Sequence, residues 1–237
     1  MSDLVKGKGD IEVFCVDLCC REVKAEAFID WLDDVERNRV KRFLQASNRE
    51  QFVGSHLALR YVLAQKLQVH PSSLEFEVCK DGKPWIKNTR GVLHFSLSHS
   101  GGRALIAVSR TYEVGADIEE VKKKQSVKEI ANRFFSSAEA EKVTQAYDAG
   151  DGGVLFCKYW VLKEAVLKAW GVGLRALGDV EINATMTDLT SQSAKYHSSE
   201  CYMQLMKLDG PVEAAVAWLG GPATVHLSRI SLEECLA

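Results

Sequence analysis

The chain has 237 residues, of which 46% are hydrophobic and 26% are charged. This length suits one large domain or two small ones, and the composition is that of an ordinary globular protein. The formal net charge of −2 creates no general field that would attract nucleic acid or a membrane surface, so any phosphate binding must depend on local lysines and arginines.

The N-terminus and the cysteines indicate the compartment. Residues 1–10 are polar and charged, and the apolar run after them is short, so the sequence shows no secretory signal. The seven cysteines are odd in number and lack paired C-x-x-C spacing. This pattern favours free thiols in a reducing environment over a disulfide or zinc framework. We therefore expect a cytoplasmic protein without a membrane span.

The first half of the chain combines one strong helix signal with several strand signals. Ser47 and Glu50 form a capping box, which predicts the start of a helix that ends at Leu67, before His70-Pro71. Glycine turns separate the strands that follow. In chain order, the expected elements are a strand at 11–18, helices at 23–32, 35–43 and 47–67, and strands at 74–78, 92–97, 103–108 and 114–119.

The second half has a similar order of elements, although no sequence repeat is visible. Ser126 and Ser136 are each followed three residues later by glutamate, which predicts two helix starts, and a long apolar helix at 154–170 ends before a glycine. These patterns predict an α+β fold of two similar lobes, residues 1–113 and 114–237, with a site in the crevice between them. The strands expected at the end of the chain are 180–183, 201–208, 212–219 and 224–232.

Acidic residues on one strand and one helix are the most informative feature. Asp117 and Glu119 point to the same face of an extended strand, and Glu164 and Lys168 lie on one helical stripe with Trp160. If that strand packs against that helix, three carboxylates converge beside one lysine. Carboxylate oxygens without histidine or cysteine suit Mg²⁺, and a lysine beside the ion suits a phosphate.

Ordinary explanations of these residues stay open at this point. The strand acids could face solvent, and Glu164 with Lys168 could form a surface ion pair. However, like charges on one strand face repel unless a cation neutralises them, and a helix that is apolar nearly all round is buried, so its charges need partners. Gly115 leaves room for the close approach of a backbone or a ligand.

Two polar turns offer further contacts. The segment Phe95-Ser-Leu-Ser-His-Ser-Gly-Gly102 provides hydroxyls, a histidine and N–H groups that suit phosphate or ribose oxygens. The segment Gly82-Lys-Pro-Trp-Ile86 offers Lys83 as a phosphate contact. Both segments are equally explained as simple turns.

Taken in order along the chain, these segments resemble the signature of the 4′-phosphopantetheinyl transferases, in the Sfp-type branch of two-lobed monomers. Ala116 and Leu97 stand where that family often has isoleucine, and neither change removes a polar group. The resemblance implies two lobes in a pseudo-twofold arrangement with the active site between them. The motifs that carry it are Gly82-Lys-Pro, Ser96-Leu-Ser-His-Ser100, Gly115-Ala-Asp-Ile-Glu119, Arg133-Phe-Phe-Ser136, and Trp160-Val-Leu-Lys-Glu164 with Lys168.

The resemblance also implies the reaction and its residues. The phosphopantetheine arm of coenzyme A would pass to a serine of an apo acyl or peptidyl carrier protein, with release of adenosine 3′,5′-bisphosphate. Asp117, Glu119 and Glu164 would bind Mg²⁺. Lys168 would contact the attacked phosphate, and Glu164 would accept the serine proton directly or through water; with Asp117 these two form the catalytic set. The residues expected to bind coenzyme A are Arg39, Gly82, Lys83, Pro84, Ser98, His99, Asp117, Lys163 and Lys168.

Other functions use the same residues. A Mg²⁺-dependent pyrophosphohydrolase of nucleotides or coenzyme A would need the same carboxylates, and a non-catalytic coenzyme A-binding module would need only the cations. The run Lys122-Lys-Lys124 is either a solvated loop or a landing patch for an acidic carrier protein. Residues 174–237 contain no candidate catalytic residue and are expected to be scaffold.

Overall fold

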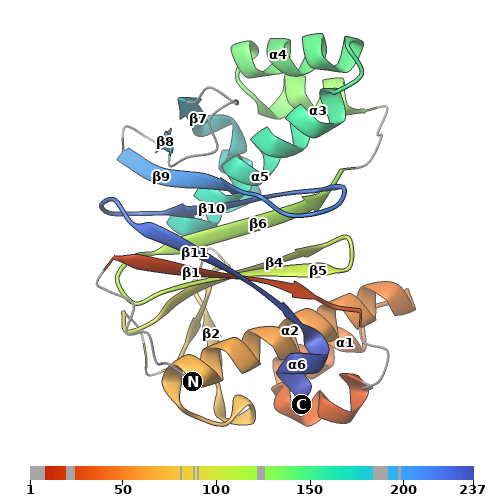
Figure 1. Ribbon diagram of the computed structural model, residues 1–237, viewed down its shortest axis with the longest axis vertical. Coiled ribbons are helices and arrows are strands. Elements are labelled where there is room, and N and C mark those ends of the chain that lie inside the picture. The colour runs from red at the N-terminus through yellow and green to blue at the C-terminus, as the bar shows by residue number, and fades with distance from the viewer. Residues whose placement is uncertain are drawn as a thin grey trace.

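The computed structural model describes residues 9–19, 25–80, 82–87, 89, 91–121, 126–183, 192–196 and 199–237. The predicted α+β class is confirmed. Two sheets pack face to face between two groups of helices, so the molecule has four layers (Figure 1). The strand order is β11-β1-β5-β4 in the first sheet and β6-β10-β9-β8-β7 in the second, and β2 and β3 form a separate pair.

The elements divide at the loop before β6. Those before the loop are β1 (Asp10–Asp17), the 3₁₀ helix η1 (Ala25–Trp31), α1 (Asp34–Val40), α2 (Ala46–Leu67), η2 (Pro71–Ser73), β2 (Phe76–Val78), β3 (Pro84–Ile86), β4 (His94–Ser100) and β5 (Arg103–Ser109). Those after it are β6 (Val114–Glu120), α3 (Val127–Phe134), α4 (Ser137–Asp148), α5 (Gly152–Trp170), η3 (Leu174–Asp179), β7 (Val180–Asn183), β8 (Gln192–Tyr196), β9 (Ser199–Met206), β10 (Val212–Trp218), β11 (Thr224–Ser231) and α6 (Leu232–Leu236).

The alternation of side chains along β6 explains where its acids lie. Val114, Ala116 and Ile118 are fully buried in the core between the two sheets. Because neighbouring side chains in a strand point to opposite faces, Asp117 and Glu119 lie on the other face, which packs against α5. The hydrophobic pattern of one strand therefore directs its carboxylates toward the long helix.

The end of the chain returns to the first sheet. β11 pairs in parallel with β1, from Asp10 opposite Thr224 to Asp17 opposite Ser231. α6 then packs on α2 in the lower helical layer of Figure 1. Residues 224–236 thus complete the first sheet and its core, although they belong to the second segment of the expected division at 113/114. That division stays a prediction.

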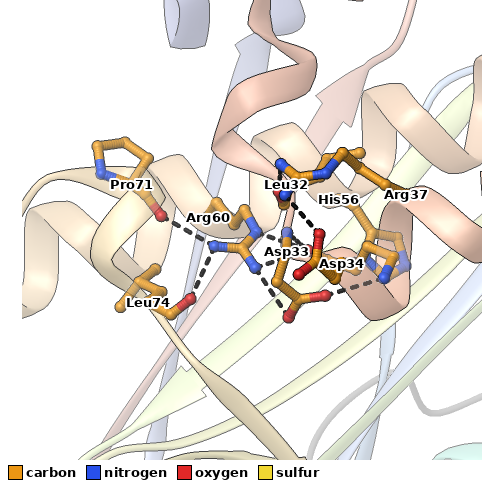
Figure 2. A network of polar contacts seen from close by, with 9 residues as sticks. Leu32, Asp33, Asp34, Arg37, His56, Arg60, Pro71 and Leu74 are labelled. Atoms are coloured by element: carbon orange, nitrogen blue, oxygen red, sulfur yellow. Dashed lines mark hydrogen bonds and ion pairs between the residues drawn. The ribbon is translucent and has the colours of Figure 1, made fainter.

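A buried arginine holds the helices beneath the first sheet together. The Arg60 side chain is fully buried, and its Nη1 donates to the carbonyls of Pro71 (3.0 Å) and Leu74 (2.9 Å). Its Nη2 donates to Asp33 Oδ2 at 3.2 Å and Glu36 Oε2 at 2.6 Å, and its Nε donates to Glu36 Oε2 at 2.9 Å. Figure 2 shows these carbonyls and Asp33 around the guanidinium. All five N–H donors of Arg60 therefore have acceptors.

Helix boundaries are where the sequence predictions differ most from the structure. The predicted capping box at Ser47 is wrong, because α2 already begins at Ala46 and the side chain of its N-cap residue, Gln45, makes no capping hydrogen bond to the helix backbone. The predicted start at Ser136 is confirmed, with the full capping box to Glu139. The 3₁₀ helix η1 occupies part of a predicted α-helix, at 23–32, and residues 21–24 lie outside the described range. The prediction missed β3, β8 and α6.

The cysteines in the described part of the chain are all free thiols, which confirms that prediction for Cys15, Cys19, Cys79, Cys157, Cys201 and Cys235. No helix within the described ranges has both the length and the apolar character needed to span a bilayer.

Candidate active site

The partly exposed stripe of α5 contains the predicted site residues. Trp160, Glu164 and Lys168 are partly accessible, whereas the residues between them on the helix are buried. Four-residue spacing places such side chains on one face of a helix, so the predicted stripe is confirmed. It faces β6 and carries one carboxylate and one ammonium group.

β6 reaches this stripe because Gly115 has no side chain. A Cβ atom on Gly115 would lie 1.9 Å from the carbonyl oxygen of Ala165 and 2.4 Å from the nitrogen of Ala169. The strand backbone therefore rests directly on the helix backbone. The expectation that Gly115 allows close approach is confirmed, and the approaching group is α5.

The carboxylate of Asp117 meets Lys168 at this contact. Lys168 Nζ lies 2.6 Å from Asp117 Oδ1 and 3.6 Å from Glu164 Oε2. Asp117 is 1% exposed, and its Oδ2 has no hydrogen-bond partner among the described residues. Since a buried carboxylate oxygen without a partner is costly, this atom is a natural place for a cation to bind.

The glutamates of the site behave differently from each other. Burial, followed by the negative charge of Asp117, raises the pKa of Glu164 to about 7. Burial alone would lower the pKa of Lys168, but Asp117 and Glu164 outweigh it and raise that pKa, so the ammonium stays charged. Glu119, two residues after Asp117 in β6, accepts a hydrogen bond from Ser100 Oγ at 3.0 Å. Glu164 is thus the carboxylate able to exchange a proton near neutral pH.

The residues in the described ranges contain no group of three or more His, Cys, Asp and Glu side chains already arranged to hold a metal. Asp117 and Glu164 share Lys168 between them, whereas the Glu119 carboxylate is engaged by Ser100. The donor set is made of hard oxygen ligands, as Mg²⁺ requires. The unpartnered Oδ2 of Asp117 supports the fit, but the described residues do not show the full convergence of three carboxylates that the sequence predicts.

A cationic region borders the lysine. The pKa of His99 is lowered first by burial and then by the positive charges of His56, Lys168 and Arg39, so these groups act on one another. Arg39 and His56 both contact the ring of Phe52: the Arg39 Cζ lies 5.1 Å from its centroid, and the His56 ring stacks on it at 4.0 Å. Since the chain as a whole is weakly acidic, this concentration of cations is local and suits an anionic ligand.

Lys83 is engaged elsewhere, at the C-terminal end of α5. Its Nζ donates to Glu113 Oε2 at 2.7 Å, to the Ala169 carbonyl at 3.0 Å and to the Val114 carbonyl at 3.3 Å. His94 also bonds to Glu113, at 3.0 Å. The hydrogen bond from His94 and the bond and charge of Lys83 lower the pKa of Glu113 to about 2, against the opposing effect of burial.

Lys83 therefore joins the start of β6 to the end of α5, and it lies at a cavity of about 270 Å³ whose lining also includes Pro84, Glu113 and Trp170. Gly82, with a φ of 95°, lines a neighbouring open groove. Sequence analysis missed Glu113 and His94, because nothing in their local pattern indicates a lysine 30 residues away from Glu113.

Lys163 is not brought to the site. Its side chain is fully buried on another face of α5, where Nζ lies 2.9 Å from Glu139 Oε2 and donates to the Val180 carbonyl. The expectation that Lys163 binds coenzyme A is not retained, because an ammonium held in the core cannot reach a solvent-borne ligand. The run 122–124 lies outside the described residues.

Comparison with known proteins agrees with the motifs. Residues 113–209 match a family model described as the 4′-phosphopantetheinyl transferase superfamily, and residues 21–111 match one described as 4′-phosphopantetheinyl transferase, N-terminal. The chain is 34% identical over 159 residues to the 4′-phosphopantetheinyl transferase HetI of Nostoc sp., a match that covers 66% of this chain and 67% of that protein.

Two further relatives are similar over shorter parts of their length. A putative 4′-phosphopantetheinyl transferase of Synechocystis sp. is 32% identical over 144 residues, which is 60% of this chain and 58% of the relative. A phosphopantetheinyl transferase of Thraustochytrium sp. is 30% identical over 154 residues, which is 60% of this chain and 54% of the relative. The chain thus spans between about half and two thirds of these relatives.

Proposed function

Because the chain belongs to the 4′-phosphopantetheinyl transferase superfamily, we propose that it transfers the 4′-phosphopantetheine group of coenzyme A to a serine of an apo acyl or peptidyl carrier protein. Adenosine 3′,5′-bisphosphate is the second product. The observation that carries this proposal is the Lys168 ammonium between Asp117 and Glu164, beside the buried Oδ2 of Asp117, which has no hydrogen-bond partner among the described residues.

The residues take distinct roles in the transfer. The serine oxygen of the carrier attacks the phosphorus that bears the pantetheine arm, a new P–O bond forms, and the bond to the adenosine bisphosphate breaks. Glu164, whose pKa is about 7, accepts the serine proton directly or through water. Lys168 lies against the attacked phosphate and stabilises its developing charge.

The metal in this proposal is Mg²⁺, held by Asp117, Glu119 and Glu164. When bound, such an ion neutralises charge on the pyrophosphate and orients its oxygens. The unpartnered Oδ2 of Asp117 is the oxygen that supports the assignment, because neither Lys168 nor Ser98 uses it.

Coenzyme A is bound by the cations around this centre. Arg39 belongs to the cationic region next to Lys168 and takes a phosphate group of the nucleotide. His99, whose pKa is lowered first by burial and then by these cations, lies in the same region and donates a ring N–H to a phosphate oxygen. Gly82, Lys83 and Pro84 form the rim of the cavity and groove at the end of α5, and Lys83 reaches a phosphate only by releasing Glu113. The family resemblance also implies that Ser98 and the backbone around it line the nucleotide site.

We also propose that the chain belongs to the Sfp-type branch of the family and is a cytoplasmic monomer. Its segments 1–113 and 114–237 are then similar lobes in a pseudo-twofold arrangement. Two sheets, each with its own helical layer (Figure 1), support the two-lobe arrangement. The residues proposed for the site come from both segments, so it lies between the lobes.

Intact-mass analysis of an apo carrier tests the reaction. Incubation with the protein, coenzyme A and Mg²⁺ is expected to add the mass of one phosphopantetheine arm. Asp117→Ala and Glu164→Gln are each expected to slow this transfer at least about a hundredfold, the scale of losing one key electrostatic group. Glu120→Gln, a change of the same type in the same strand, serves as the control and should transfer at the normal rate.

Other outcomes would point to the competing functions. Cleavage of coenzyme A without any carrier would identify a pyrophosphohydrolase, and tight binding without Mg²⁺-dependent turnover would identify a binding module. Normal transfer rates in both Asp117→Ala and Glu164→Gln would remove the site from the proposal.

A further inference from the structure

Two edge strands from different sheets lie next to each other at the site. β4 ends the first sheet and β6 ends the second, and the backbone ladders of the two sheets do not join them. Serine side chains form the connection instead. Ser96, Ser98 and Ser100 alternate along β4, so all three point to the same face, and each one reaches β6.

These serines, named here the serine bridge, make different kinds of contact. Ser96 Oγ accepts the N–H of Ala116 at 3.0 Å, a contact with backbone only. Ser98 Oγ donates to Asp117 Oδ1 at 2.7 Å. Ser100 Oγ donates to Glu119 Oε2 at 3.0 Å and accepts the N–H of Glu120 at 3.1 Å. Two of the three serines thus bind the side chains of the strand acids.

We propose that Ser98 and Ser100 are positioning residues that orient the carboxylates of Asp117 and Glu119 for the divalent ion, whereas Ser96 only joins the strands. The inference rests on the metal assignment in the proposed function. Ligands of a metal are commonly held in place by hydrogen bonds from outside the coordination sphere, and these bonds affect metal affinity.

The geometry at Asp117 supports this role. Ser98 and Lys168 both donate to Oδ1, which fixes the rotation of the carboxylate and leaves Oδ2 as the oxygen without a hydrogen-bond partner among the described residues. Without Ser98, the carboxylate could turn either oxygen toward Lys168, and the unpartnered oxygen would have no fixed position. The serine therefore determines which oxygen is offered to a cation.

The same contact limits what else Ser98 can do. A serine hydroxyl has a single proton to donate, and here that proton goes to Asp117. A coenzyme A phosphate oxygen is an acceptor and needs a donor. Ser98 can therefore not hold Asp117 and donate to a phosphate at the same time, so its hydroxyl serves the metal side of the site rather than the nucleotide side.

Substitution of each serine by alanine separates positioning from strand joining. Mn²⁺ is titrated into the full chain with coenzyme A and without a carrier, and free Mn²⁺ is followed by electron paramagnetic resonance. We expect the Kd for Mn²⁺ to rise about tenfold or more in Ser98→Ala and to rise also in Ser100→Ala. Ser96→Ala, the matched control, should bind Mn²⁺ as the wild type does, although it loses a contact between the same strands.

Several outcomes would overturn the inference. One is an unchanged Kd in Ser98→Ala, including the case in which only the KM for coenzyme A rises, because Ser98 would then be a phosphate donor. Another is an equal loss in Ser96→Ala and Ser98→Ala, which would mean that any break in the bridge loosens the site. If Ser98→Ala does not fold, Ser98→Cys keeps the shape with a weaker donor; unchanged Mn²⁺ affinity in that variant also overturns the inference.

Failure of the proposed function gives a different result. A wild-type chain that adds no phosphopantetheine to any carrier in the intact-mass assay, yet binds Mn²⁺ more tightly than Ser98→Ala, contradicts the transferase and supports the positioning role. A wild-type chain that modifies the carrier but binds no Mn²⁺ overturns the positioning role and leaves the transferase.

Discussion

The clusters around Arg60 and Lys168 contain the same kinds of charged groups, but they differ in how completely those groups are hydrogen-bonded. In each, one cation lies between two carboxylates: Arg60 between Asp33 and Glu36, and Lys168 between Asp117 and Glu164. Every N–H of Arg60 has an acceptor (Figure 2). At Lys168 the side chain is 31% exposed, and one oxygen of its partner carboxylate has no hydrogen bond within the described structure.

The completeness of the hydrogen bonds distinguishes a cluster that stabilises the fold from a site that can bind a ligand. A buried charge whose hydrogen bonds are all made holds its elements in one arrangement, and a ligand would have nothing to add. A carboxylate that is buried but incompletely bonded carries a desolvation cost that a cation can remove. The complete network therefore predicts an effect on stability, and the incomplete one an effect on binding and turnover.

The largest expected effect sharpens the structural side of this comparison. Arg60→Met leaves Glu36 and Asp33 without their main cation, and breaking a buried ion pair from one side typically destabilises a protein by about 3–5 kcal/mol. Urea unfolding of the variant should show a loss of this size, while the Mn²⁺ affinity of the folded fraction stays normal. Lys87→Met is the control, because the pair of Lys87 with Glu75 is exposed to solvent, and exposed ion pairs contribute little to stability.

A loss of Mn²⁺ affinity in folded Arg60→Met would break the comparison, since it would couple the two clusters. If Arg60→Met lost no more unfolding free energy than Lys87→Met, the buried network would not stabilise the fold.

Much of the site could be predicted from period and spacing, and its partners could not. The two-residue alternation placed Asp117 and Glu119 on one face, and the four-residue spacing placed Glu164 and Lys168 on one stripe. A step of one residue turns a helix by about 100°, so Lys163 could have been assigned to another face than Glu164.

Contacts between distant segments leave no local signal in the sequence. Arg60 has partners at Asp33 and Leu74 on either side of it in the chain. Ser98 is 19 residues from Asp117, and Lys83 is 86 residues from Ala169. The pairing of β11 with β1 likewise follows from packing, because an ordinary strand pattern at the end of a chain does not specify its neighbour.

A smaller effect is expected from changing the contact that creates the Lys168 cluster. Gly115→Ala puts a methyl group 1.9 Å from the Ala165 carbonyl oxygen, so β6 and α5 must separate. Overpacking of this kind costs about 1–3 kcal/mol, and both the unfolding free energy and the Mn²⁺ affinity should fall, since Asp117 moves away from Lys168. Gly178→Ala is the control, because the nearest atom to its added Cβ, the Phe134 carbonyl oxygen, is 4.0 Å away.

Normal Mn²⁺ affinity in Gly115→Ala, with reduced stability, would contradict the view that this backbone contact aligns the site. Equal behaviour of both glycine variants would show that β6 shifts without strain.

The pH dependence of the unfolding free energy distinguishes the two clusters by its sign. Burial alone would raise the pKa of Glu36, but hydrogen bonds from His56 and Arg60 outweigh it and lower that pKa. Its ionised form therefore stabilises the fold above the ordinary glutamate pKa of about 4.3, and this contribution is lost as the pH falls through the lowered value. Burial raises the pKa of Glu164 to about 7. Ionisation of Glu164 therefore destabilises the fold. This destabilisation grows as the pH rises from about 4.3 to 7, and it is complete above 7.

Urea unfolding of the chain in EDTA at a series of pH values tests both signs. Glu36→Gln should be less stable than the wild type at pH 7, with a difference that shrinks below about pH 4. Glu164→Gln should be more stable than the metal-free wild type at pH 8, with a difference that shrinks as the pH falls below 7. Curves of the same sign for the two variants would remove the distinction, because a carboxylate that stabilises the fold at pH 8 without metal has no unmet demand for a cation.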